Sequence, residues 1–127
     1  NEAKSQVTGK AGKNSEPIHQ TEKSIHSTEK LNKIAYAVAI AETKDCTTGI
    51  GLTHNNCHGI KQGSIAPCKK IKRGFCVYGS KEESYEAFKK IWQIGYGGGL
   101  PNKAMAATWT GNDNPSAWLN NFYKAYK

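Results

Sequence analysis

The sequence predicts an α+β fold that is mainly helical, with a short β and loop region after its first helix. Two observations lead to this prediction. Apolar residues recur at helical spacing in four segments, three of which lie in the last fifty residues. Between the first segment and the others, residues 47–61 are rich in Gly, Thr, Asn and His, and residues 74–78 have the composition of a short strand.

The first helix is expected to begin near Ser27 or Thr28, which are both favourable caps. Its apolar positions have the spacing of a single buried stripe: Leu31, Ile34, Ala35, Val38 and Ala41. For residues 47–61 we predict turns with a short hairpin. Residues 69–73 form a basic run that leads into the predicted strand.

Three further helices are expected in the second half of the chain. A capping box of Ser80 and Glu83 opens the first of them, which ends at the glycines of residues 95–99. Pro101 is suited to the first position of the next helix, which runs to about residue 109. Asn114 caps the last helix, whose inward residues are expected to be Trp118, Leu119, Phe122 and Tyr126.

Residues 1–28 differ from the rest of the chain in composition. They contain no aromatic residue and few large apolar ones, so they cannot bury enough surface to offset their ordering entropy. We therefore predict a disordered tail or linker over residues 1–28 and one folded domain over residues 29–127. The chain does not begin with Met and contains no signal peptide, so we expect that an export signal or anchor lay upstream.

The formal net charge is +8, and nearly all of it belongs to the predicted domain. A basic surface suits a polyanionic partner, such as nucleic acid, an anionic membrane or an acidic cell wall. Nucleic acid is not expected, because basic and aromatic residues do not interleave on strands and zinc-finger spacing is absent. Stable membrane insertion is not expected either, because no apolar run is long enough.

Four cysteines without a Cys-x-x-Cys pair favour disulfides over a zinc ribbon. Three pairings are possible. The local one, Cys46–Cys57 with Cys68–Cys76, is preferred because each bridge would close a loop in the Gly-rich, polar part. His54 and His58 beside Cys57 offer a less favoured metal site, and we predict neither a metal nor a cofactor. Disulfides imply an oxidising compartment, so we expect a secreted, periplasmic or cell-wall-associated monomer.

Glu42 is the most informative residue, because it extends the apolar stripe of the first helix. It follows Val38 by four positions and Ala35 by seven, so it lies on the same face. Partial burial and a helix C-terminus both raise the pKa of a carboxyl, as a general acid requires. The alternative is that Glu42 turns to solvent or pairs with a lysine. Asp45 is the only candidate for a second catalytic carboxylate, unless the substrate supplies its own nucleophile.

Three segments resemble the lysozyme-like superfamily: residues 39–42 (Ala-Ile-Ala-Glu), residues 55–62 (Asn-Asn-Cys-His-Gly-Ile-Lys-Gln) and residues 75–84. The nearest branches are the bacterial endo-N-acetylglucosaminidases of the flagellar and autolysin type and the lytic transglycosylases. Residues 59–62 are similar to the Gly-Leu-Met-Gln motif of the transglycosylases, and residues 107–111 to their Ala-Tyr-Asn-x-Gly. The chain departs from these patterns at Thr43, which replaces a common Ser, and at Thr108-Trp109, which replaces Tyr-Asn.

The resemblance covers about residues 30–126 and implies a lysozyme-like domain with Glu42 as the catalytic acid. It also implies that the loop after Glu42 binds substrate through Asn56, Gly59, Ile60, Lys61 and Gln62. Exposed aromatic rings pack against sugars, so Tyr78, Tyr96 and Trp109 are further substrate-binding candidates, although each also suits a core. Trp92 and Trp118 fit buried stripes and are expected in the core.

We therefore predict a peptidoglycan-degrading, bacteriolytic glycosidase of the endo-N-acetylglucosaminidase or muramidase kind. Its partner would be the glycan strand of the cell wall. Two alternatives stay open: a lytic transglycosylase that gives anhydro products, and a non-catalytic cationic module that binds the wall.

Overall fold

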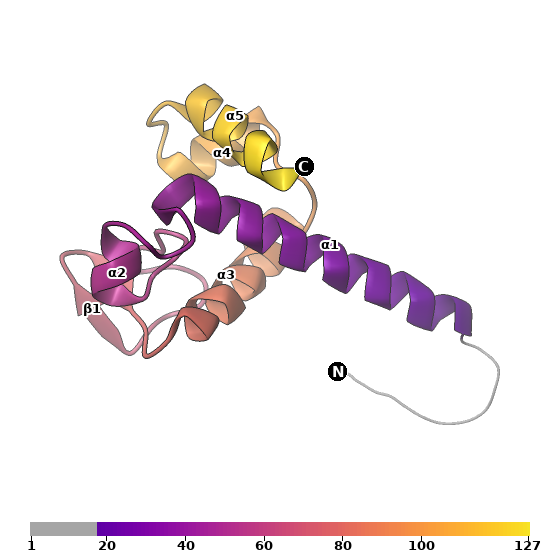
Figure 1. Ribbon diagram of the computed structural model, residues 1–127, viewed down its shortest axis with the longest axis horizontal. Helices are drawn as coiled ribbons and strands as arrows, with labels where there is room; N and C mark the ends of the chain where they lie inside the picture. Colours follow the sequence, from indigo (N-terminus) through magenta and orange to yellow (C-terminus); the bar gives the residue numbers. More distant parts are fainter. Residues whose placement is uncertain (1–17) are drawn as a thin grey trace. The chain divides into compact units, whose positions relative to one another are not determined.

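The computed structural model describes residues 18–127, with side chains from Ser27 onward, so residues 1–17 of the predicted tail lie outside the described residues. The chain divides into two units, Asn1–Lys30 and Leu31–Lys127. The described part is mainly helical and contains a two-stranded antiparallel sheet, in agreement with the predicted α+β class (Figure 1). None of the described helices is long and apolar enough to cross a membrane.

Helix α1 spans Ile18–Thr43, so the predicted start near Ser27 is wrong. In the sequence, residues 18–27 contain no Gly and no Pro and include several good helix formers, and nothing there stops a helix. The predicted stripe is confirmed within the second unit, where these side chains are at most 7% exposed: Leu31, Ile34, Ala35 and Val38.

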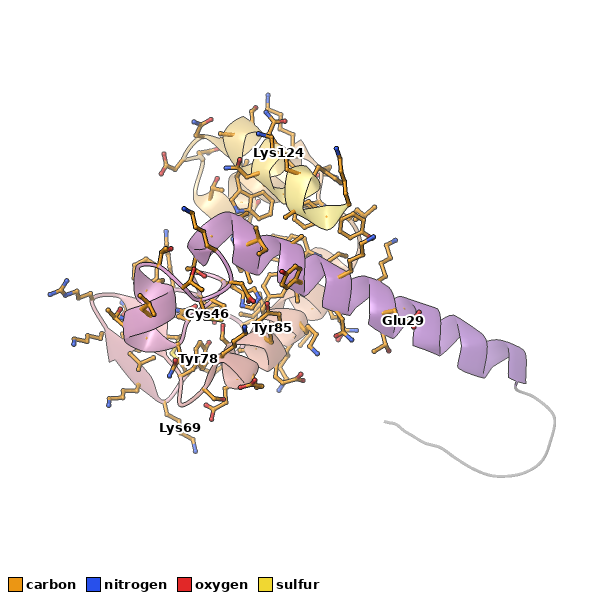
Figure 2. All side chains as sticks on the ribbon, in the orientation of Figure 1. Glu29, Cys46, Lys69, Tyr78, Tyr85 and Lys124 are labelled. Carbon is orange, nitrogen blue, oxygen red and sulfur yellow. A yellow bond between two sulfur atoms is a disulfide. The ribbon has the colours of Figure 1, made fainter. Side chains whose placement is uncertain are left out.

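A short helix, α2 (Ile50–His54), follows α1 in place of the predicted hairpin. The disulfide Cys46–Cys57 encloses α2, and Figure 2 shows Cys46 in the segment that leaves α1. Gly51 lets α2 approach this segment closely, because a Cβ there would lie 2.6 Å from the Cα of Cys46. Tertiary packing thus holds a helix that the polar, turn-rich composition of residues 47–61 does not indicate.

Strands β1 (Lys70–Lys72) and β2 (Phe75–Val77) form the hairpin, with Lys70 opposite Val77 and Lys72 opposite Phe75. The predicted strand is confirmed, but the preceding basic run also contains a strand. All of β1 is exposed, and pairing with β2 rather than burial keeps it extended. Lys61 forms a bridge to Phe75 on the other side of β2. The second disulfide, Cys68–Cys76, ties the hairpin to the preceding loop, so both preferred pairings are confirmed.

Helices α3 (Lys81–Tyr96), α4 (Lys103–Thr110) and α5 (Pro115–Tyr126) complete the unit. Ser80 and Asn114 cap α3 and α5 as predicted, each accepting a backbone N–H. The predicted start of α4 at Pro101 is wrong. Asn102 is the cap, because its side chain accepts the N–H of Met105. Helices α4 and α5 pack against each other (Figure 1).

One hydrophobic core joins α1, α3, α4 and α5 within Leu31–Lys127. Phe88 and Trp92 of α3 are fully buried and stack at 5.3 Å between ring centroids. Phe122 of α5 is also fully buried, and Trp118 is 8% exposed. The core therefore reaches the C-terminal end of α1, where Glu42 lies.

Candidate functional site

Glu42 is the second-last residue of α1, and two indole rings bind its carboxyl. Trp109 Nε1 donates to Glu42 Oε2 over 2.9 Å, and Trp118 Nε1 donates to the same oxygen over 2.8 Å. The other oxygen, Oε1, faces Gly59, where a Cβ on the glycine would lie 3.3 Å from it. Among the described residues, none donates a hydrogen bond to Oε1. The carboxyl therefore has one oxygen held by the protein and one open to a ligand.

The environment of Glu42 raises the pKa of its carboxyl. Desolvation by the surrounding protein is the main cause, and it outweighs the two indole hydrogen bonds and the charge of Lys61, which lower the pKa. Solvent still reaches the residue, since Glu42 is exposed. Both facts fit a carboxyl in a concave site, where protein surrounds the group on most sides and one side stays open. Such a carboxyl holds its proton to a higher pH than an ordinary Glu.

Aromatic packing holds the two indole rings. Trp109 of α4 is half-buried, with its ring edge-on to Phe88, Trp92 and Tyr96 at centroid distances of 5.5–5.8 Å. Trp118 of α5 is stacked on Phe122 at 5.8 Å. Trp118 was expected only in the core. It lies there, and its N–H also binds Glu42. The helical periodicity of α5 predicts which face of the helix carries Trp118, but not the direction in which the indole N–H points.

A pocket of about 260 Å³ lies beside this carboxyl. Its walls come from the loop after Cys57, from α3 and from α4: Gly59, Ile60, Lys61, Gln62, Gly63, Ser64, Ile65, Ile91, Tyr96 and Trp109. Gly59 faces Oε1 of Glu42 and Trp109 binds Oε2, so the carboxyl lies at the edge of the pocket. Six of the eight predicted substrate-binding residues line this one space: Gly59, Ile60, Lys61, Gln62, Tyr96 and Trp109.

Asn56, a seventh predicted residue, is fully buried and is not in the pocket lining. Its Nδ2 donates to the carbonyls of Ile60 and Cys76, and its Oδ1 accepts the N–H of Ile60. Asn56 therefore shapes the loop that carries Gly59 and Lys61. Gly59 itself has a φ of 72°, a conformation that favours glycine.

Tyr78, the eighth predicted residue, lies directly after β2 (Figure 2) and does not belong to the pocket lining. Its hydroxyl is buried without a hydrogen-bond partner among the described residues. Desolvation, with a smaller contribution from the charge of Glu83, raises the pKa of Tyr78 to about 12. The hydroxyl therefore stays neutral.

Asp45, the candidate second carboxylate, is bound elsewhere. Its Oδ1 accepts the hydroxyl of Tyr85 over 2.6 Å, and its Oδ2 accepts the ammonium of Lys81 over 2.9 Å. Burial alone would raise the pKa of Asp45, but these hydrogen bonds and the charge of Lys81 lower it. In the described part of the chain no Asp or Glu belongs to the pocket lining, so Glu42, at its edge, is the carboxyl that the site offers.

His58, which the sequence offers as part of a less favoured metal site, neither lines the pocket nor faces solvent. It is fully buried, stacks on Phe88 at 4.6 Å and contacts Ser84 Oγ and the carbonyl of Ala35 through its two ring nitrogens. Desolvation lowers its pKa to about 3. Cys57 is in a disulfide, and residues 27–127 contain no cluster of three metal-ligating side chains.

A cationic face extends from the pocket across the hairpin. Lys72 of β1 pairs with Phe75 across one edge of β2, and Lys61 pairs with Phe75 across the other edge. Lys70 lies two residues before Lys72 on β1. Directly opposed residues and residues two apart share one face of a sheet, so these three lysines point the same way. Within residues 27–127 none of them pairs with an acidic side chain. Lys69 extends from the ribbon next to β1 (Figure 2).

No family model, curated protein or solved structure matches this chain.

Proposed function

We propose that this chain cleaves the glycan strand of the bacterial cell wall, with Glu42 as the general acid. One observation carries the proposal: a carboxyl with a raised pKa and one open oxygen lies at the edge of a pocket with aromatic walls. Cleavage of a glycosidic bond requires an acid that is protonated near neutral pH and that reaches the leaving oxygen. The resemblance of residues 39–42, 55–62 and 75–84 to the lysozyme-like superfamily points to the same chemistry.

The pocket suits one sugar unit of the strand. Its volume of about 260 Å³ is slightly below the range of drug-sized ligand sites, which starts at about 300 Å³. The rings of Tyr96 and Trp109 offer apolar faces and edges to a sugar ring. Gln62 and the backbone of residues 59–63 supply polar groups for hydroxyl and acetamido substituents. The adjoining lysines attract the anionic wall.

In this mechanism Glu42 protonates the bridging oxygen, and an oxocarbenium-like state forms as the bond breaks. The described residues place no second carboxylate at the pocket, so we assign the second step to water or to a hydroxyl of the substrate. In the second step the attacking O–H group gives its proton to the Glu42 carboxylate, which restores the acid. Attack by water gives a reducing sugar, as in a hydrolase. Attack by the sugar's own hydroxyl gives an anhydro product, as in a lytic transglycosylase. The absence of a nearby carboxylate in the described part of the chain favours the second branch.

Loss of turbidity of purified cell walls tests the proposal. Glu42→Gln keeps the size and polarity of the side chain and removes the proton that it donates, so activity is expected to fall at least 100-fold. Glu86→Gln is the matched control, because Glu86 is exposed on α3 and, within residues 27–127, forms an ion pair with Lys89 alone. Wild-type turbidity loss by a folded Glu42→Gln variant contradicts the proposal.

The cationic face favours one second candidate, a wall-binding module without catalysis. Such a module depends on Lys70 and Lys72 and not on Glu42. We expect Lys70→Glu with Lys72→Glu to weaken binding to wall sacculi, with a shallower dependence on salt because fewer charges are involved. Lys124→Glu with Lys127→Glu, at the end of α5, is the control of equal charge change. Sacculus binding that is unchanged by Glu42→Gln, combined with an inactive wild type, supports this second candidate.

A further inference from the structure

Two tryptophan N–H groups from different helices converge on one oxygen of Glu42. Their distances to Oε2 are 2.9 Å from Trp109 and 2.8 Å from Trp118. The two rings come from different helices, α4 and α5, and reach the carboxyl from residues 67 and 76 positions away. By contrast, Trp92 donates its N–H to the carbonyl of Gly99.

The bonding capacity of a carboxyl gives this convergence a chemical consequence. Each carboxyl oxygen offers two lone pairs, and two indole donors occupy both of those on Oε2. An indole N–H only donates, so it cannot accept the acid's proton in exchange. When Glu42 is protonated, the proton must therefore be on Oε1, the oxygen that faces Gly59 at the pocket.

We propose that Trp118 is a positioning residue that, together with Trp109, confines the transferable proton of Glu42 to Oε1 and so fixes where the cleaved bond lies. The catalytic role of this proton rests on the proposed function, but its position on Oε1 does not depend on activity. Trp118 is absent from the pocket lining, so it acts through Glu42 and not on the substrate. Trp109 has both roles, since it lines the pocket and binds the carboxyl.

The arrangement also makes the C-terminal helix part of the site. Stacking on Phe122 holds the ring of Trp118, and Phe122 is fully buried in the core. The carboxyl of α1 thus takes its orientation from α5, which contributes no residue to the pocket.

Trp118→Phe tests the inference, because it keeps an aromatic ring and removes the N–H. The readout is the pKa of Glu42, followed by NMR of the side-chain carboxyl carbon in protein with ¹³C-labelled glutamate. A lost donor to the charged form raises this pKa, by roughly one unit. The alkaline limb of the pH–activity profile is expected to move upward by the same amount, with a fall in kcat at nearly constant KM.

Tyr123→Phe is the matched control, since it also deletes one side-chain donor of α5 while keeping the ring, but this donor binds the carbonyl of Pro101 and not the carboxyl. It is expected to leave the pKa of Glu42 unchanged. If Trp118→Phe does not fold, a benzothienyl-alanine at position 118 removes the N–H while keeping the ring size, and the same shift is expected. An unchanged pKa of Glu42 in a folded variant without this N–H overturns the inference. The NMR titration gives its answer even for a chain that cleaves nothing, so failure of the inference and failure of the proposed function are distinguishable.

Discussion

Trp118 Nε1 lies 2.8 Å from Glu42 Oε2, although the two residues are 76 positions apart in the chain. This contact joins the end of the first helix to the last helix of the domain, and Trp109 adds a second donor from α4. Glu42 is thus held by the C-terminal helices on one side, while Gly59 and the pocket lie on the other. Substitutions around the carboxyl and in the core behind it should therefore have separable effects on activity and on stability.

The charge of Lys61 lowers the pKa of Glu42. Lys61→Met removes a charge that stabilises the carboxylate, so the pKa of Glu42 should rise and the acid should stay protonated to a higher pH. Because Lys61 is exposed and solvent screens its charge, we expect the alkaline limb of the pH–activity profile to move upward by less than about one unit. Lys44→Met, which removes an exposed charge two residues from Glu42, should leave the limb in place. Equal shifts in both variants would argue against a specific effect of Lys61.

We expect wall cleavage to require a glycine at position 59, next to Oε1 of Glu42. Gly59→Ala puts a side chain on a backbone with φ of 72° and places its Cβ 3.3 Å from Oε1. The conformation alone costs about 1–2 kcal/mol of unfolding free energy. Gly74→Ala is the control, because Gly74 has a φ of 83° but open space where its Cβ would be. Chemical denaturation should show similar losses of stability, whereas wall cleavage should fall at least tenfold more in Gly59→Ala.

His58 should make the fold less stable in mild acid. Its folded pKa of about 3 lies below the ordinary value of 6.5, so only the unfolded chain takes up a proton between these values. The contribution of neutral His58 to the free energy of unfolding is therefore fully present above pH 6.5. It is lost as the pH decreases toward 3, by up to about 1.4 kcal/mol per pH unit. Between pH 6.5 and 4 this effect is separate from that of Asp45, whose lowered pKa acts only at more acidic pH. Denaturation of wild type and His58→Gln over this range checks the prediction, and equal slopes would contradict it.

The two disulfides are expected to contribute equally to stability but unequally to the site. Their loops are similar, with sequence separations of 11 and 8, so chain entropy predicts a loss of about 3 kcal/mol for each when both its cysteines become alanine. Cys46–Cys57 joins the segment after Glu42 to the loop that carries Gly59. Its removal should also lower wall cleavage under conditions where the variant is fully folded. If the Cys68–Cys76 variant loses as much activity, the special role of Cys46–Cys57 is wrong.

The sequence is informative about this fold where periodicity and capping act locally. The stripe of α1, the cap Ser80 and the cap Asn114 follow from residue spacing alone. Helix α2 and strand β1 do not, because a disulfide and a partner strand hold them against a weak local preference.

The same division applies to the candidate site. The apolar stripe of α1 predicts the position of Glu42, and the motif of residues 55–62 predicts the loop that lines the pocket. The hydrogen bond between Trp118 and Glu42 could not be predicted from the sequence, because it depends on how α5 packs. The burial of His58 could not be predicted either, because it depends on packing against Ser84 on α3 and a carbonyl of α1. In each case residues distant in sequence determine the result.

The most direct test of the central claim is mass spectrometry of purified peptidoglycan after incubation with the wild-type chain and with Glu42→Gln. The proposed function predicts new glycan fragments from the wild type alone, with reducing ends if water completes the reaction and anhydro ends if a sugar hydroxyl does. No new fragments from a folded wild type, or the same fragments from both proteins, would contradict the assignment of Glu42 as the acid.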